Sequence, residues 1–371
     1  MLLASAKMMQ QTFGWNVTTC IWATGILVGF YTVAGGLAAV VYTDVIQCAV
    51  MIGGCLLVLV LGLIDVGGWD GLMARLEDSR HHAELIVPVD AESPFPWPAI
   101  LFGLAFILSP AYWIGNQAIV QRSLGARSEF EAKASYVWGA VLKNVIPIII
   151  AVPGLIAAAK YRDLGQGDAA FPRLVSDLLP AGLRGVFVAG FLAALMSSVD
   201  SYLNAASTIL CHDLYKRFLR PDADDQRLLS VGRATTFGLV LWGIGFALVF
   251  LRVSEESGIY TIFQTLMAFF QGPALAVLML GMLWRRATGA AAITAFLTGV
   301  ATSVSLFVLS RPGTTAALGW EPLFQIPDPF LYFSVWAFLV TAVVLAFVSL
   351  ATRLEPEEKL QYVFHWRRAG S

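Results

Sequence analysis

The sequence predicts an all-α integral membrane protein, and three observations support this fold class. Of its 371 residues, 58% are hydrophobic and only 13% are charged, a composition unlike that of soluble domains. Several apolar runs reach the ~20 residues that a helix needs to cross a hydrocarbon core. Backbone hydrogen bonding permits only helices or closed barrels there, and runs of this length favour helices.

A single transmembrane domain is expected over residues 1–371, with about nine membrane helices. The helices are predicted near residues 18–34, 39–64, 98–121, 137–159, 185–210, 230–251, 259–284, 288–310 and 329–351. Gly35 and Gly36 fit a tight turn between the first two helices. Lys and Arg are frequent in the loops 122–136, 212–229 and 285–287, so the positive-inside rule places these loops and the C-terminal tail in the cytoplasm.

Composition also excludes several classes of partner and cofactor. A net charge of −1 and a pI near 6.4 provide no basic field for nucleic acid. The four cysteines form no close-spaced pair, which indicates structural thiols. All four histidines lie outside the membrane runs and no HExxH motif is present, so we expect neither an enzyme nor a bound cofactor. The lipid bilayer is the expected surrounding medium.

The stretch FLAALMSSVDSYLNAAST, residues 191–208, combines an apolar face with a polar one. At 100° per residue, its serines, Asp200, Asn204 and Thr208 fall within one half of the helix. A hard cation such as sodium prefers small oxygen ligands, and Ser197 and Ser198 lie one turn from the carbonyl of Ala194. The alternative is that these hydroxyls bond carbonyls of their own helix or join neighbouring helices.

Two carboxylates strengthen the cation-binding interpretation. Asp200 lies at membrane depth, where an ionised group is costly unless it is paired or hydrated, and such groups usually mark functional sites. Asp44 enters the second predicted helix within YTVAGGLAAVVYTDVIQ, residues 31–47. It is also close enough to a helix start to act as a cap, so both interpretations stay open for Asp44.

Three segments together resemble the sodium-solute symporter family, which contains the sodium-glucose cotransporters. They are YTVAGGLAAVVYTD, YWIGNQAIVQRSLGARSEFEAK and LRGVFVAGFLAALMSSVDSYLNAASTILCHDLYK. The resemblance runs from near residue 10 to about residue 290. It implies the inverted-repeat fold of secondary transporters, with sodium as the coupling ion and the substrate held near the membrane midplane.

The resemblance also assigns roles to individual residues. It implies that Ala194, Ser197 and Ser198 contribute to the main sodium site. The region of Asp44, Asp200 and Ser201 matches a second sodium site of some members, many of which have Ser or Thr in place of Asp200.

The resemblance further implies that Tyr112 and Trp113 form an inner gate and that Ser109, Lys143 and Gln264 contact the substrate. Considered without the family, the two aromatic residues also suit packing or the interfacial belt. Lys143 suits either snorkelling or pairing inside the bundle, and Gln264 could join helices. Arg122 and Arg127 are interpreted as part of a solvated cytoplasmic loop.

The chain departs from the family pattern at its start, because helices that normally precede residue 10 are missing. We favour an incomplete chain from an active transporter over a truncated, inactive product. The expected activity is sodium-coupled symport of a small polar solute, a sugar or polyol, by alternating access in a bacterial inner or plasma membrane. An amino-acid or organic-acid symporter and a non-transporting sensor are the alternatives, and saturating, sodium-coupled uptake would separate a symporter from a channel.

Overall fold

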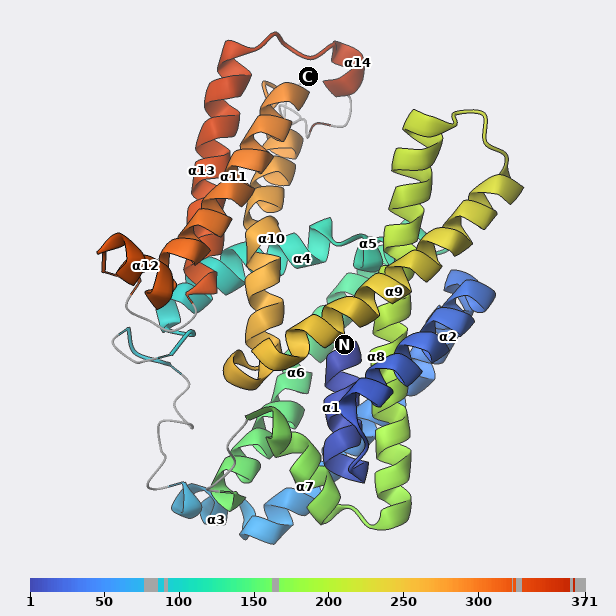
Figure 1. The fold of residues 1–371 in the computed structure, drawn as a ribbon, viewed down its shortest axis with the longest axis vertical. Coiled ribbons are helices and arrows are strands. Elements are labelled where there is room, and N and C mark those ends of the chain that lie inside the picture. Colours follow the sequence, from blue (N-terminus) through green and yellow to red (C-terminus); the bar gives the residue numbers. More distant parts are fainter. Residues whose placement is uncertain are drawn as a thin grey trace. The chain divides into compact units, whose positions relative to one another are not determined.

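The computed structural model describes most of the chain as a set of helices. Its described residues are 1–76, 86–89, 93–161, 167–321, 323–324, 329–360 and 363. Within helices, the side chains of residues 31, 34–43, 252–257, 312 and 318 are not described. No strand occurs in this described part of the chain, which confirms the predicted all-α class (Figure 1).

The chain divides into two compact units. Unit 1 holds residues Met1–Glu84 and Gln121–Ile259, and unit 2 holds Leu85–Val120 and Tyr260–Ser371. The helices that lie wholly within unit 1 are α1 (Leu2–Phe13), α2 (Val17–Val66), α3 (Gly68–Arg75), α6 (Glu129–Lys160), η3 (Gly167–Ala169), α7 (Ala170–Leu178), α8 (Ala181–Thr208), the π-helix η4 (Ile209–Leu219) and α9 (Asp225–Ser257).

Helix α8 is fixed by two apolar cores of unit 1, one toward each end. Near its start, Phe187 and Val188 pack with residues of α2, α6 and α7. Near its end, Leu203 packs with residues of α1, α2 and α9, among them Ile21 and Ile244. The segment between these anchors, which contains the serines and Asp200, is therefore held at a defined position in unit 1.

Unit 2 is built around α13 (Phe330–Ala351), whose Phe330, Leu331 and Phe333 are fully buried. Glycines let neighbouring helices approach the α13 backbone closely, since a Cβ added at Gly272 would lie 2.4 Å from the Ser334 carbonyl oxygen. The other helices of unit 2 are the π-helix η2 (Ala99–Leu108), α4 (Ser109–Gly115), α10 (Ile259–Leu283, apart from its first residue), α11 (Gly289–Leu309), α12 (Pro312–Leu318) and α14 (Glu357–Leu360).

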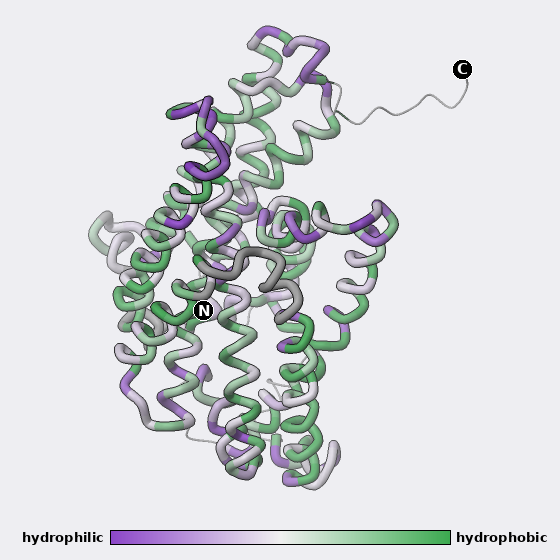
Figure 2. The backbone as a smooth tube through the Cα atoms, turned by 90° about the vertical axis from the view of Figure 1, so that its right-hand side faces the viewer, coloured by the Kyte–Doolittle hydropathy of each residue, from purple (hydrophilic) through white to green (hydrophobic). Residues whose placement is uncertain are grey.

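Seven helices in the described part of the chain are long and apolar enough to cross a membrane. They are Asp44–Val66, Glu129–Lys160, Ala181–Leu219, Asp225–Leu251, Ile259–Leu283, Gly289–Leu309 and Phe330–Ala351. A further broken span consists of Ala99–Gly115 and Gln117–Leu124, and Val17–Phe30 is a shorter apolar helix. Figure 2 shows hydrophobic residues along the long helices and hydrophilic residues gathered at their ends and connections.

Three predicted helices differ from the observed ones in continuity. The expected continuous helix 98–121 is broken at Asn116, where the backbone is extended and α5 (Gln117–Leu124) begins at an angle of 50° to the preceding part. The two helices expected at 18–34 and 39–64 are recorded as one helix, α2. The turn predicted at Gly35 and Gly36 falls on residues 34–43, whose detailed placement within α2 is not described.

Candidate cation site

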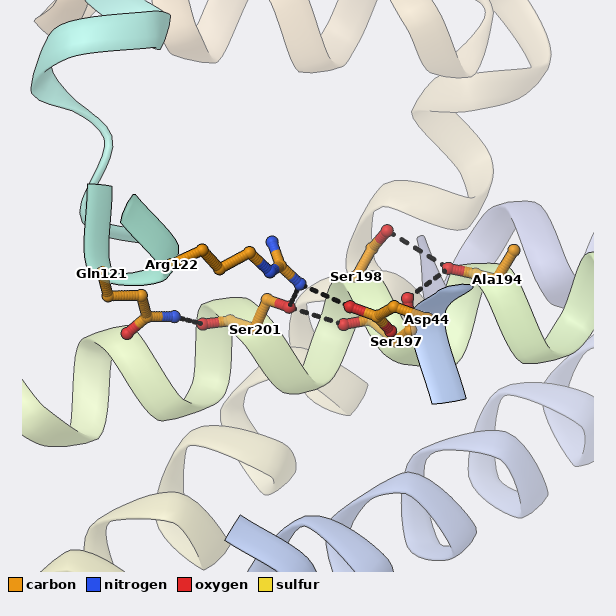
Figure 3. A network of polar contacts seen from close by, with 7 residues as sticks. All are labelled: Asp44, Gln121, Arg122, Ala194, Ser197, Ser198 and Ser201. Carbon is orange, nitrogen blue, oxygen red and sulfur yellow. Dashed lines mark hydrogen bonds and ion pairs between the residues drawn. The ribbon is translucent and has the colours of Figure 1, made fainter. Parts of the chain in front are cut away.

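The serines of α8 donate hydrogen bonds to carbonyl oxygens of their own helix, as the alternative to cation binding predicts. The hydroxyls of Ser197 and Ser198 both donate to the Ala194 carbonyl oxygen, at 3.3 and 3.2 Å, and Ser201 donates to the Ser197 carbonyl oxygen at 2.8 Å (Figure 3). Each hydroxyl oxygen keeps lone pairs that can accept a hydrogen bond or coordinate a cation. The Ala194 oxygen becomes fully available to a cation only when a serine hydroxyl turns away.

Ala194, Ser197 and Ser198 face a cavity of about 330 Å³ within unit 1. Asp44 and Gln47 of α2 and Arg122 of α5 also line it, and the remaining lining is largely apolar, from helices α2 and α6. Small oxygen ligands and one carboxylate in a partly apolar cavity suit a monovalent hard cation. Among the described residues, no three His, Cys, Asp or Glu side chains gather as a metal cluster.

Arg122 joins two of the predicted cation ligands. Its Nη2 atom donates to Asp44 Oδ2 at 2.7 Å and to Ser201 Oγ at 2.5 Å, so α5, α2 and α8 meet at one guanidinium (Figure 3). The neighbouring Gln121 donates from Nε2 to the Ser201 carbonyl oxygen at 3.4 Å. Arg122, which the sequence suggested as part of a solvated loop, is indeed exposed, but it lies in helix α5 and pairs with Asp44 and Ser201. The available sequence signal was its position as the first charge after the apolar run 98–121.

Asp200 lies away from this cluster although Ser201 follows it directly in the chain. Its side chain is 1% exposed and hydrogen-bonded to the Thr32 hydroxyl, which also lies 2.7 Å from the Val28 carbonyl oxygen. Successive residues of a helix point about 100° apart. The structure thus directs Asp200 toward the first half of α2, whereas Ser201 reaches the pair of Asp44 and Arg122.

The predicted gate residues lie on α4 in unit 2. Ser109 begins this short helix before Pro110, and Tyr112 and Trp113 follow on it, all three half-buried. The helix ends at Gly115, and the Oδ1 atom of Asn116 accepts a hydrogen bond from the Ala118 amide at 3.0 Å. This side-chain contact at a helix start stabilises the break in the span.

The other two predicted substrate residues lie in different units. Gln264 on α10 of unit 2 is half-buried, and its Nε2 donates to the Tyr260 hydroxyl at 2.9 Å. Lys143 on α6 of unit 1 is exposed. The roles of both in binding a substrate stay predictions.

Several known proteins with similar sequences are cotransporters. The model of the sodium:solute symporter family matches residues 1–299. Sodium/glucose cotransporter 4 from Homo sapiens is 32% identical over 404 residues, which cover 99% of this chain and 58% of that protein. Sodium/myo-inositol cotransporter 2 from Homo sapiens is 32% identical over 403 residues, with 99% of this chain and 59% of that protein covered.

A solved structure of a Na⁺-coupled sialic acid symporter, in a substrate-bound outward-open state, has a similar fold. Its TM-score is 0.76 at 19% sequence identity, and the match covers 95% of this chain and 71% of that one. This chain spans 58% of the length of sodium/glucose cotransporter 4. The family match and the candidate membrane spans lead to one conclusion. The chain is an integral, multi-pass membrane protein that belongs to the sodium:solute symporter family.

Proposed function

We propose that this chain is part of a symporter that couples the uptake of a small polar solute to the entry of sodium. The observation that carries the proposal is the cavity in unit 1, where Ser197, Ser198 and the Ala194 carbonyl meet a carboxylate from α2. The family membership supports it, since the relatives named above are sodium-dependent cotransporters by name.

The proposed main sodium site consists of Ala194, Ser197 and Ser198. A sodium ion would draw the serine oxygens toward itself and free the Ala194 carbonyl from one of its two hydroxyl donors. Asp44 and Ser201 are the proposed direct ligands of a second cation. Asp200 belongs to this second region in the proposal, and its bond to Thr32 suits a positioning role between α2 and α8.

Coupling by alternating access needs ligands that favour one conformation over another. Sodium and solute must each bind the occluded state more tightly than the open one, because a ligand with equal affinity for both shifts nothing. In the proposal, Tyr112 and Trp113 close under the solute, and Ser109, Lys143 and Gln264 contact it. Hydroxyl, ammonium and amide groups beside aromatic rings suit a sugar or polyol.

Uptake into proteoliposomes tests this function directly. We place the complete protein in a bacterial inner membrane or another plasma membrane. It would be purified and reconstituted into proteoliposomes with an inward sodium gradient, or with an inward potassium gradient for comparison. We expect sodium-dependent, saturable uptake of glucose or myo-inositol. Uptake of an amino acid or organic acid instead would revise the solute class. Sodium-dependent binding without uptake would identify a sensor, and the absence of both would contradict the proposal.

A further inference from the structure

The Arg122 guanidinium occupies the position expected for the second cation. It contacts the Asp44 carboxylate at 2.7 Å and the Ser201 hydroxyl at 2.5 Å, which are the two residues of the predicted second site that come together in unit 1 (Figure 3). A guanidinium carries the same charge as a sodium ion and likewise binds oxygen atoms. Arg122 is therefore placed as a cation that the protein itself supplies.

The charges that line the cavity indicate that this guanidinium and a sodium ion compete for the Asp44 carboxylate. Asp44 and Arg122 are the only charged side chains among the described residues that line the cavity, and their charges cancel. A sodium ion bound while Arg122 stays in place would lie beside a like charge, which disfavours it. Once Arg122 leaves, the carboxylate is free to neutralise the ion.

The cavity also holds acceptor oxygens that Arg122 does not satisfy. Asp44 Oδ1 and Gln47 Oε1 are buried and have no hydrogen-bond partner among the residues that the structure describes. They lie three positions apart on α2, so both fall on one face of the helix. Buried oxygens without donors are costly, and a cation between them would satisfy both.

Exposure allows Arg122 to leave its partners. Its side chain is 37% exposed and that of Asp44 is 21% exposed, so the guanidinium has access to water. A displaced arginine would therefore be hydrated and not left as a buried, unpaired charge, which would be strongly unfavourable. Exchange between Arg122 and a small cation is physically reasonable at this site.

We propose that Arg122 is a tethered cation that fills the site of Asp44 and Ser201 in the absence of sodium, and that an entering sodium ion displaces it with Gln47 as an additional ligand. This inference rests on the proposed sodium-coupled function. Arg122 follows the break at Asn116, on the same broken span as Tyr112 and Trp113. Its displacement would break the contact of α5 with Asp44 of α2 and one of its two contacts with Ser201 of α8, which makes Arg122 a positioning residue that links cation occupancy to this span.

Cys48 provides a reporter for this exchange. It is exposed and lines the cavity with Asp44 and Gln47, whereas Cys20, Cys55 and Cys211 are buried. A small water-soluble thiol reagent would be applied to the complete protein at increasing sodium concentration, with choline keeping the ionic strength constant. Peptide mass spectrometry would give the modification rate of Cys48, and the sodium midpoint of its change reports occupancy of the cavity.

We expect Arg122→Gln to lower the sodium midpoint at least tenfold, because the competing cation is gone. Arg122→Lys, which keeps a charge, should give a smaller shift. Arg127→Gln removes a positive charge from an exposed position five residues away and should leave the midpoint unchanged. Gln47→Leu and Asp44→Asn should each raise it.

The outcomes separate the two proposals. If sodium does not change the Cys48 rate in the wild-type protein, the proposed cation site itself fails. If wild type responds but Arg122→Gln and Arg122→Lys leave the midpoint unchanged or raise it, the competition is refuted while the sodium site stands. A lower midpoint in Arg127→Gln equal to that in Arg122→Gln would also refute it, since the effect would then be one of general charge.

Discussion

Replacing Ser198 by alanine should weaken sodium binding much more than folding. The hydroxyl of Ser198 donates to the Ala194 carbonyl oxygen at 3.2 Å, and that oxygen keeps its second bond, from Ser197 at 3.3 Å, when the first is lost. Intrahelical serine bonds of this kind add little to stability, and alanine is the better helix former by about 0.5 kcal/mol. The fold should therefore tolerate Ser198→Ala.

The effect on the ion should be large because one oxygen ligand disappears. Interactions of a polar group with a charge contribute about 1.5–3 kcal/mol each, which corresponds to roughly a 10- to 150-fold higher sodium concentration for half-maximal activation. Sodium-activated uptake in proteoliposomes would measure this shift.

Ser207→Ala is the matched control for Ser198→Ala. It removes the same group from the same helix, but the Ser207 hydroxyl donates to the Gly232 carbonyl oxygen at 3.0 Å and Ser207 does not line the cavity. We expect lower thermal stability for Ser207→Ala and an unchanged sodium midpoint. Equal sodium midpoints for Ser198→Ala and wild type would refute the assignment of Ser198 as a ligand.

Three further changes test the fold and the site. Gly272→Ala would place a Cβ 2.4 Å from the Ser334 carbonyl oxygen and should destabilise unit 2 by about 1–3 kcal/mol in thermal unfolding. The control Gly281→Ala lies on the same helix, where an added Cβ meets no atom within 4 Å, and should not destabilise it. Equal melting temperatures for the two variants would contradict the packing argument. The hydrogen bond from the Gly289 amide lowers the pKa of Glu355, and the hydrogen bond and positive charge of Lys359 lower it further. Its ionised form therefore stabilises the folded state above the ordinary glutamate pKa, and this contribution is lost as the pH falls through the lowered pKa. Glu355→Gln should have a lower melting temperature than wild type at neutral pH and the same melting temperature at acidic pH. A difference that persists in acid would show that the ionised carboxylate is not the source of the stabilisation. Asp200→Asn should weaken the sodium dependence of uptake without preventing membrane insertion, and unchanged sodium activation would remove Asp200 from the second site.

Hydropathy predicted the helices that cross the membrane in simple apolar runs. The last three predicted helices, 259–284, 288–310 and 329–351, agree with α10, α11 and α13 to within one residue at each end. This accuracy has a physical cause, since an uninterrupted apolar run must be as long as the hydrocarbon core is thick.

Polar helical segments were harder to predict because hydropathy does not register them. Helix α6 begins at Glu129, eight residues before the predicted start, where Ser128 accepts a hydrogen bond from the Glu131 amide and Glu131 accepts one from the Arg127 amide. Such a capping arrangement is visible in the sequence but not in an average of apolarity. The break at Asn116 was missed because apolar residues lie on both sides of it.

The candidate site could be predicted from the sequence only for residues that lie on a single helix. Helical periodicity placed Ser197, Ser198 and Ser201 on a polar face, and the structure brings Ser197 and Ser198 to the cavity. The contact of Arg122 with Asp44 joins positions 78 residues apart, and the contact of Asp200 with Thr32 joins positions 168 apart. Neither follows from a local pattern, because each depends on how separate helices pack in unit 1.

Direct binding of radioactive sodium to the purified complete protein tests the central claim most directly. We predict saturable binding that potassium does not displace. The double variant Ser197→Ala/Ser198→Ala should lose the main component of this binding, while the Ser207→Ala control keeps it. Saturable binding that is identical in the double variant, or no saturable binding to the wild-type protein, would contradict the assignment of a sodium site to this cavity.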